Sequence, residues 1–146
     1  TYGASVLAVK TGESGRKVVI INGGLQHLGS PFISPGGGIP DLNCQVVRDG
    51  RIIENSQVAL QEMVIYGSLC LSLDSLHPRL LLPTDLKSGD RLIFPNCGAY
   101  GLTAGLVHFI GQDLPAEYMI DNSGNPGRLV DITNKNFKLY HQCFDL

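Results

Sequence analysis

The residue best suited to chemistry in this chain is Cys70, which lies in the turn Gly67-Ser68-Leu69-Cys70-Leu71-Ser72-Leu73-Asp74. The turn directly follows the strand-like run Glu62-Met63-Val64-Ile65-Tyr66, so we expect the thiol at the edge of a sheet, where loops carry function. A thiol of ordinary pKa, about 8.5, is a reasonable acid at neutral pH. A plain packing role is the alternative, because free cysteine is among the most buried residue types.

Three further clusters combine glycine with polar or aromatic residues. They are Asn22-Gly23-Gly24-Leu25-Gln26-His27, Gly98-Ala99-Tyr100-Gly101-Leu102-Thr103 and His108-Phe109-Ile110-Gly111. Adjacent glycines let the backbone approach another group closely, although most glycine pairs only make turns. The run Gly36-Gly37-Gly38 lacks the lysine and the helix start of a phosphate loop.

A cysteine hydrolase is one interpretation of these clusters, with Cys70, Asp74 and either His27 or His108 as its three groups. No local signature supports it, and such signatures do not transfer between families. Asp74 also has a structural alternative, which is to cap a helical turn through its carboxylate.

The elements that must position these residues are predicted to be mostly strands. The expected strands are Ala4–Lys10, Lys17–Ile21, Asn43–Arg48, Gln61–Tyr66, Arg79–Leu82, Arg91–Pro95, Leu106–Ile110, Glu117–Ile120 and Arg128–Ile132. Turns are expected at Thr11–Gly15, Asp49-Gly50 and Lys87–Asp90, and a loop at Ser34–Pro40. Leu69–Leu76 and Thr133–Leu139 are expected to form short helical turns. Many short strands at close spacing predict a mainly β fold, an antiparallel barrel or sandwich with a few helical turns.

Composition limits the class of protein. The 146 residues are expected to form one domain, 1–146, and only 16% of them are charged, so part of the surface is expected to be covered by a partner. The net charge of −2 comes without a basic stripe, which argues against nucleic-acid binding. No apolar run approaches the roughly 18 residues needed to cross a bilayer, so no membrane partner is expected. Four widely spaced cysteines indicate free thiols, no metal site and a cytoplasmic location.

Taken in order along the chain, the clusters resemble the C-terminal β-domain of the fold-type III pyridoxal-phosphate decarboxylases, the ornithine, diaminopimelate and arginine decarboxylase family. The Cys70 turn is similar to the family's G-P-x-C-x-S-x-D motif, Gly98-Ala99-Tyr100 to its G-A-Y, and Phe109-Ile110-Gly111 to its F-x-G. Asn22–His27 resembles the version found in members of specialised biosynthesis, as does Pro115-Ala116-Glu117. The resemblance implies a Greek-key-like β-barrel of the alanine racemase C-terminal type.

The resemblance also implies that the active site is shared between two domains. The cofactor would be pyridoxal 5′-phosphate, held as a Schiff base by a lysine of an N-terminal (β/α)₈ barrel, and the active enzyme would be a homodimer. Cys70 would reach the partner's site and protonate Cα after carbon dioxide leaves, while Tyr100 and Gly98 would lie beside the cofactor. The residues expected near the small amino-acid substrate are Leu71, Asp74, Gly23, His27 and Phe109.

Two departures from the family pattern bear on the substrate. Many diamine-forming members carry an acidic residue where this chain has Leu71, and another where it has Gly23. A buried ammonium needs a partner charge, so ornithine and lysine are poor substrate candidates. A larger or less basic amino acid, such as a precursor of a natural product, fits better.

The (β/α)₈ barrel is expected to lie outside this chain, because such a barrel takes about 250 residues. The isolated chain is therefore expected to be inactive, and the chain to be one part of a lyase of amino-acid metabolism. The alternative is a non-catalytic homologue that binds and regulates a related decarboxylase. A racemase is a third interpretation; its chemistry usually uses a tyrosine as the opposing base, and the Cys70 turn argues against it.

Overall fold

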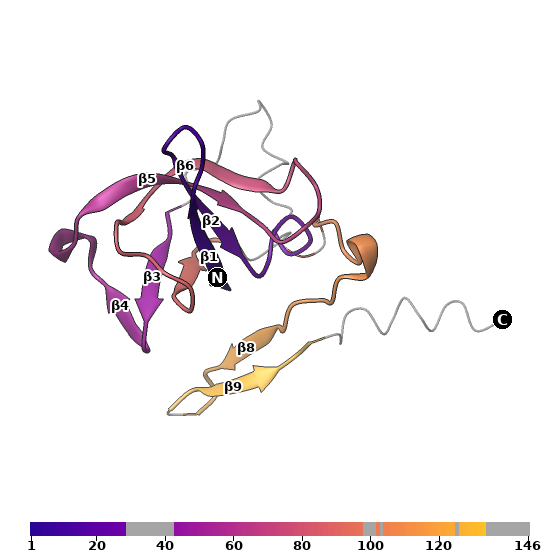
Figure 1. Ribbon diagram of the computed structural model, residues 1–146. Coiled ribbons are helices and arrows are strands. Elements are labelled where there is room, and N and C mark those ends of the chain that lie inside the picture. Colours follow the sequence, from indigo (N-terminus) through magenta and orange to yellow (C-terminus); the bar gives the residue numbers. More distant parts are fainter. Residues whose placement is uncertain (29–42, 98–101, 103, 125, 134–146) are drawn as a thin grey trace. The chain divides into compact units, whose positions relative to one another are not determined.

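The structure is a computed structural model that describes residues 1–28, 43–97, 102, 104–124 and 126–133. The chain comprises two compact units, Thr1–Phe109 and Ile110–Leu146. The first holds a seven-stranded sheet and the second a two-stranded hairpin, as Figure 1 shows. The predicted mainly β fold is therefore confirmed, and helix is limited in the described residues to short 3₁₀ turns.

The strands of the sheet are β1 (Tyr2–Thr11), β2 (Lys17–Ile21), β3 (Gln45–Arg48), β4 (Arg51–Ile53), β5 (Leu60–Tyr66), β6 (Ser75–Pro83) and β7 (Arg91–Phe94). The hairpin consists of β8 (Tyr118–Asp121) and β9 (Arg128–Asp131), and the 3₁₀ turns are η2 (Asn55–Gln57) and η3 (Phe109–Gly111). The strands that coincide with predicted ranges, such as β2 and β5, are rich in β-branched and aliphatic residues, which fit a pleated, half-buried surface.

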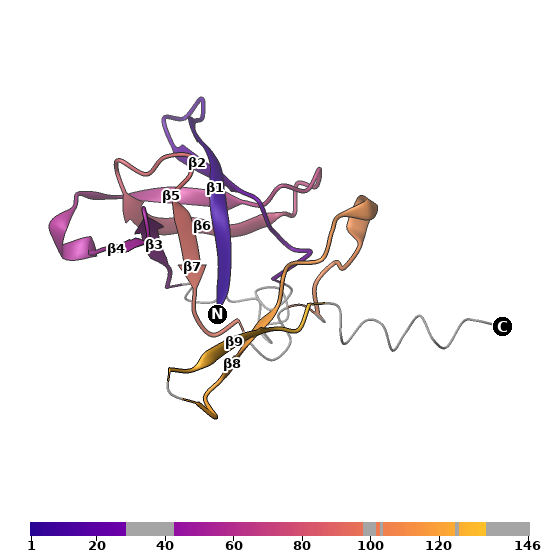
Figure 2. The ribbon, with the colours of Figure 1, turned by 90° about the horizontal axis from the view of Figure 1, so that it is seen from below.

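The strand order is β4-β3-β7-β1-β2-β5-β6. Neighbours are antiparallel except β2 and β5, which pair in parallel from Lys17 opposite Met63 to Ile20 opposite Tyr66. The expectation of a wholly antiparallel sheet is therefore wrong at this pair, since the chain returns to the sheet by a crossover rather than a hairpin. In Figure 2, β1 and β7 run across the direction of β5 and β6, so the sheet curves strongly.

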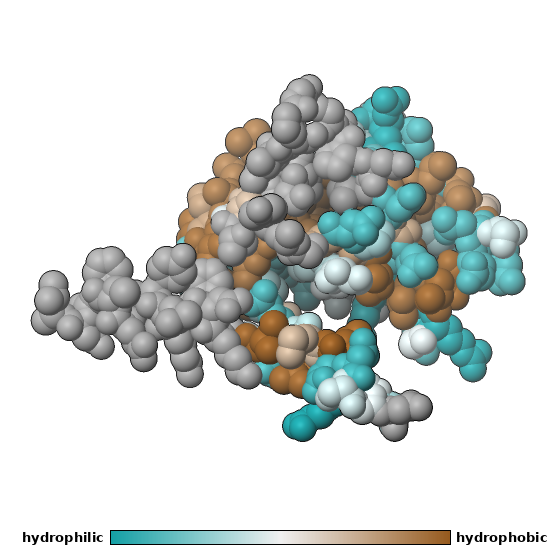
Figure 3. Space-filling view, turned by 180° about the vertical axis from the view of Figure 1, so that it is seen from behind, coloured by the Kyte–Doolittle hydropathy of each residue, from teal (hydrophilic) through white to brown (hydrophobic). Residues whose placement is uncertain are grey.

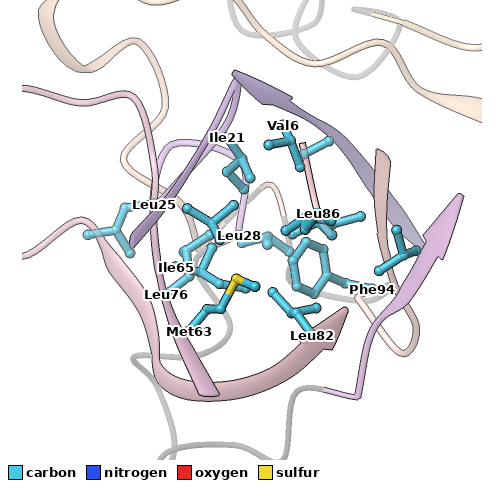
Figure 4. Close-up of a cluster of buried hydrophobic side chains, with 14 of the residues drawn as sticks. Val6, Ile21, Leu25, Leu28, Met63, Ile65, Leu76, Leu82, Leu86 and Phe94 are labelled. Carbon is cyan, nitrogen blue, oxygen red and sulfur yellow. The ribbon is translucent and has the colours of Figure 1, made fainter. Parts of the chain in front are cut away.

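The buried side chains gather inside this curve. Figure 4 shows Val6 of β1, Ile21 of β2, Met63 and Ile65 of β5, and Phe94 of β7 converging, and each is at most 1% exposed. On β1 the inward side is shared by alternate residues, because successive side chains of a strand point to opposite faces. The loop residues Leu25 and Leu28 complete the same core, which ties the segment after β2 to the sheet.

Two turns and one strand were predicted closely. Lys17–Ile21 is a strand with the predicted limits, and β1 and β2 form the hairpin expected around Thr11–Gly15. Asp49 and Gly50 have φ of 49° and 75°, the two left-handed residues that a tight hairpin turn between β3 and β4 requires.

Two other predictions are wrong. Leu106–Ile110 is not a strand, because His108 and Ile110 have φ of 60° and 48°, outside the extended region. Leu69–Leu76 is not helical either, since it consists of bends and a turn and Ser75 already begins β6. The predicted loop at Ser34–Pro40 lies outside the described residues, as does all but the first residue of the predicted helical turn at Thr133–Leu139.

An ion-pair network that the sequence did not predict joins β3 to the loop between β6 and β7. The Arg48 guanidinium donates to Asp90 from Nε at 2.8 Å and to Asp85 from a terminal nitrogen at 2.7 Å. Burial raises the pKa of Asp90, but hydrogen bonds from Arg48 and the Lys87 N–H outweigh it, and the pKa is lowered overall. The hydrogen bond from Arg48 lowers the pKa of Asp85 as well.

Large apolar side chains also reach the surface. On the face drawn in Figure 3, hydrophobic residues lie among hydrophilic ones. In the hairpin, Tyr118, Met119, Ile120 and Leu129 are 50–67% exposed. None of the described helices is long and apolar enough to span a membrane.

Candidate functional site

The turn that carries Cys70 connects β5 to β6. Leu69 is buried and Leu71 is partly buried against the core, whereas Cys70 between them is exposed. The turn is closed by hydrogen bonds from the Gly67 N–H to the Asp74 carbonyl at 2.9 Å and from the Asp74 N–H to the Leu71 carbonyl at 3.0 Å. Two inward leucines thus hold the backbone while the thiol between them faces outward.

The Asp74 carboxylate joins this turn to the loop after β2. It is 1% exposed, and it accepts hydrogen bonds from the Leu25 and Leu69 N–H groups, each at 2.8 Å. Burial raises the pKa of Asp74, although both backbone hydrogen bonds act against this. The alternative that Asp74 has a structural role, binding backbone N–H groups through its carboxylate, therefore agrees with the structure. The turn that it closes is not helical, however. Its place near the substrate stays a prediction.

Gly24 and Gly67 lie on the two sides of this carboxylate. A Cβ atom at Gly24 would come within 2.6 Å of Asp74 Oδ2, and one at Gly67 would overlap the same oxygen. Contacts this short do not occur for real side chains, so both positions need glycine for lack of space. The glycine pair of the sequence and the Cys70 turn are thus parts of one cluster, which we call the Asp74 cluster and define as residues 23–27 and 67–74.

His27 lies in the same cluster and meets a residue that the sequence analysis missed. The Tyr2 hydroxyl lies 3.0 Å from His27 Nδ1, and the two rings meet edge to face with centroids 5.9 Å apart. Tyr2 also stacks on Phe94, with ring centroids 6.1 Å apart. Its only sequence signal is strand alternation, which places Tyr2 on the same side of β1 as buried Ala4.

The segment that ends at Phe109 packs against the same loop. The Leu106 N–H donates to the Leu25 carbonyl at 3.0 Å, and a Cβ at Gly105 would lie 2.7 Å from the Gln26 carbonyl oxygen. Phe109 itself is partly buried against the core. The predicted cofactor contacts Gly98 and Tyr100 lie outside the described residues.

The arrangement does not support a cysteine hydrolase. Both Asp74 oxygens accept hydrogen bonds from backbone N–H groups, and His27 Nδ1 meets the Tyr2 hydroxyl, so each group already has a structural partner. No group of three or more potential metal ligands occurs in the part of the chain that the structure describes. Within the Asp74 cluster, the thiol of Cys70 is exposed on the turn between β5 and β6.

Comparison with known proteins identifies the family. Residues 1–98 match the family described as pyridoxal-dependent decarboxylase, C-terminal sheet domain. The chain belongs to this family. The resemblance inferred from the ordered clusters is thereby confirmed, and the family is one of pyridoxal-dependent decarboxylases.

One curated relative of the family domain is similar in sequence. It is L-glutamyl-[BtrI acyl-carrier protein] decarboxylase of Niallia circulans, 32% identical over 124 residues, which are 83% of this chain and 27% of the relative. A crystal structure of diaminopimelate decarboxylase is 25% identical, with a TM-score of 0.71, and the match covers 99% of this chain and 34% of that one. This chain therefore spans about a third or less of these relatives.

More distant structures share the fold alone. Diaminopimelate decarboxylase from Helicobacter pylori, complexed with L-lysine, is 16% identical with a TM-score of 0.67, over 97% of this chain and 32% of that one. Arginine decarboxylase of Paramecium bursaria Chlorella virus, bound to agmatine, is 23% identical with a TM-score of 0.59, over 75% of this chain and 27% of that one.

Proposed function

We propose that this chain is the β-domain of a pyridoxal-phosphate-dependent amino-acid decarboxylase and that Cys70 protonates Cα of the substrate after carbon dioxide leaves. The observation that carries the proposal is the exposed thiol of Cys70 between two inward-facing leucines. An acid that must reach a substrate in another domain needs an exposed side chain on a backbone that does not move. In the proposed enzyme the domain completes the site of a barrel domain in a homodimer.

The residues of the Asp74 cluster fit one part of a cofactor site. They include the exposed thiol of Cys70 but no lysine or arginine. In the proposed enzyme, the lysine that anchors the cofactor and the main phosphate contacts therefore belong to the barrel domain. Gly98 and Tyr100 stay predicted contacts of the cofactor. When bound, pyridoxal phosphate acts as the sink for the electron pair left at Cα.

The Cys70 backbone is held on both sides. The Leu69 N–H donates to the buried Asp74 carboxylate, and the Ser68 N–H donates to the Gly23 carbonyl at 2.9 Å. These hydrogen bonds fix the backbone on the N-terminal side of Cys70, so the position of the thiol varies mainly by rotation of its own side chain. Fixed geometry of this kind is what general acid catalysis requires.

The substrate is proposed to be an amino acid without a distal ammonium. Leu71 is apolar and partly buried, and the carboxylate of Asp74 is buried with both oxygens engaged. A distal ammonium would find no accessible carboxylate in the Asp74 cluster, and a charge without a partner is costly to desolvate. The relative from Niallia circulans, named as a glutamyl acyl-carrier-protein decarboxylase, supports a role in specialised biosynthesis.

The test is Cys70→Ala in the complete enzyme, with turnover followed in deuterium oxide. We expect kcat to fall by about 10²-fold or more, the usual contribution of a positioned general acid, and deuterium to enter Cα without stereochemical control. Leu81→Ala is the matched control, since Leu81 is 56% exposed on β6, outside the Asp74 cluster, and should leave turnover unchanged. An unchanged rate and product configuration in Cys70→Ala would refute the assigned role.

The cofactor is tested separately by the intact mass of every chain in the purified protein after borohydride reduction. A covalent pyridoxyl adduct on the chain that carries the barrel is the expected result. A single species of 15.7 kDa without an adduct would instead favour the non-catalytic alternative, a homologue that binds a related decarboxylase.

A further inference from the structure

The hairpin of β8 and β9, labelled in Figure 1, exposes most of its large apolar side chains. Tyr118, Met119, Ile120 and Leu129 are 50–67% exposed. A two-stranded hairpin of this kind is marginally stable at best in water unless its apolar residues pack against another element. The sheet that contains β8 has β9 as its one other described strand, so this packing must come from outside the sheet.

The register of the hairpin sorts these side chains by face. Residues directly opposite each other on an antiparallel pair share a face, as do residues two apart along one strand. Ile120 lies opposite Leu129, and Tyr118 precedes Ile120 by two residues, so all three share a face. We call Tyr118, Ile120 and Leu129 the hairpin face. Asp131 lies opposite Tyr118 at its open end, which gives the face an apolar centre and a charged rim, as protein interfaces have.

The opposite face of the hairpin is better suited to water. On it, Met119 lies opposite Val130, which is already partly buried. The next pair toward the turn is Asp121 opposite Arg128, which carry opposite charges. This face therefore stays solvated at little cost, whereas the hairpin face brings three large apolar side chains together and favours a partner.

The exposed apolar side chains of the first unit are dispersed over the part that the structure describes. Leu7, Ile52 and Leu81 lie on β1, β4 and β6, three strands that are not adjacent in the sheet. Tyr66 and Leu73 lie beside or within the Cys70 turn, which the proposed function directs toward the barrel domain. The first unit thus presents separate apolar residues rather than one face that matches the hairpin face.

Most of a decarboxylase of this family lies outside this chain. The chain spans 27% of the relative from Niallia circulans and 34% of the similar diaminopimelate decarboxylase. In the proposed enzyme the barrel domain accounts for most of the remaining length. It is therefore the largest surface that the hairpin face can meet.

We propose that the hairpin face is a docking surface for the barrel domain of the decarboxylase, with Ile120 and Leu129 at its centre and the Tyr118 ring beside them. Burial of apolar surface is the main favourable term in most protein association. A tyrosine suits the border of such a surface, because its ring buries a large apolar area while its hydroxyl stays in contact with water. The inference rests on the proposed function, which it extends from the Cys70 turn to a second contact with the barrel domain.

The contact is tested by photo-cross-linking in the complete enzyme, with Tyr118→p-benzoylphenylalanine. The variant keeps an aromatic ring on the hairpin face, and irradiation joins that ring to a C–H group that lies against it. We expect peptide mapping to find the adduct in the barrel domain. An adduct with residues 1–109 would mean that the first unit covers the face, and an adduct between two hairpins would mean that a second copy of the chain does. Either result, or no adduct, would overturn the docking surface.

Amide hydrogen exchange tests the same contact with ordinary side chains. In the complete enzyme, Leu129→Ser should speed exchange in the segment 117–133 by about tenfold or more, the factor that corresponds to the lost burial of one leucine. Met119→Ser is the matched control, because it makes a similar change on the opposite face of the same hairpin and should have a much smaller effect. Equal acceleration in the two variants would show that nothing covers the hairpin face in particular, and it would overturn the proposal.

The outcomes separate this inference from the proposed function. A pyridoxyl adduct on the chain that carries the barrel, together with a hairpin that cross-links elsewhere, would overturn the docking surface and leave the decarboxylase assignment intact. A cross-link outside residues 1–146, in a protein whose borohydride-reduced form carries no pyridoxyl adduct, would refute the proposed function and the identity of the docked domain together.

Discussion

Replacement of Asp74 should remove the hydrogen bonds that join the Cys70 turn to the loop after β2. In Asp74→Ala, the buried N–H groups of Leu25 and Leu69 lose their acceptor. A buried donor without a partner costs about 1–3 kcal/mol, so the variant should lose on the order of 2–6 kcal/mol of unfolding free energy. This is a large fraction of the roughly 5–15 kcal/mol that stabilises an ordinary domain.

Asp74→Asn separates the two hydrogen bonds from the charge. The amide oxygen can accept from one N–H, while the amide nitrogen meets the other as a donor. Only one bond is then replaced, so the loss should be about 1–3 kcal/mol. Because burial raises the pKa of Asp74, removal of the charge offsets part of this loss, and we expect a value in the lower half of the range.

Urea unfolding of the chain, followed by tyrosine fluorescence, measures both values, since the chain has no tryptophan. Asp49→Asn is the matched control, because Asp49 is exposed in a left-handed turn position that asparagine also adopts readily. The control should change the unfolding free energy by less than about 0.5 kcal/mol. An Asp74→Ala variant as stable as this control would show that the two N–H groups find other partners, and it would refute the reasoning.

Three further predictions concern other parts of the first unit. Gly67→Ala should lower the unfolding free energy, because its Cβ would overlap the buried carboxylate, whereas Gly12→Ala, with its nearest contact at 3.5 Å, should not; urea unfolding of the two variants decides. Loss of the Arg48 guanidinium in Arg48→Leu should flatten the fall in stability on acidification. Its two carboxylate partners have pKa values below the ordinary 3.8, so their contribution is present above that pH and is lost as pH falls through the lowered values. A titration of unfolding free energy against pH that keeps the wild-type slope would contradict this. At neutral pH, a thiol reagent should label Cys70, which is exposed, much faster than Cys44, because burial raises the pKa of Cys44 to about 12. Peptide mapping of the labelled sites over time gives the order, and equal rates would contradict the packing of the partly buried Cys44 against the core.

The candidate site was partly predictable because its chemistry lies in short motifs. The Cys70 turn was expected at the edge of the sheet because it follows a strand-like run, and the structure has an exposed thiol there. The packing of Leu69 and Leu71 against the core, which directs the thiol outward, was not predicted. The glycine pair was also recognised, but its physical reason was not. Gly24 is small because a carboxylate from a distant turn occupies the adjacent space, and no property of the local sequence carries that information.

The sequence by itself determined most of the strands, the tight turn at Asp49-Gly50 and the family, because side-chain alternation, turn propensity and motif order are local properties of the chain. The tertiary structure alone decided which distant residues meet. Tyr2 meets His27 across 25 positions because β1 and β2 are antiparallel, which puts the start of β1 beside the segment that follows β2. Asp74 bonds Leu25 across 49 positions because β2 and β5 pair in parallel and bring the segments that follow them to the same end of the sheet. Such pairings depend on the register and order of strands, which follow from burial of the whole core rather than from any one segment.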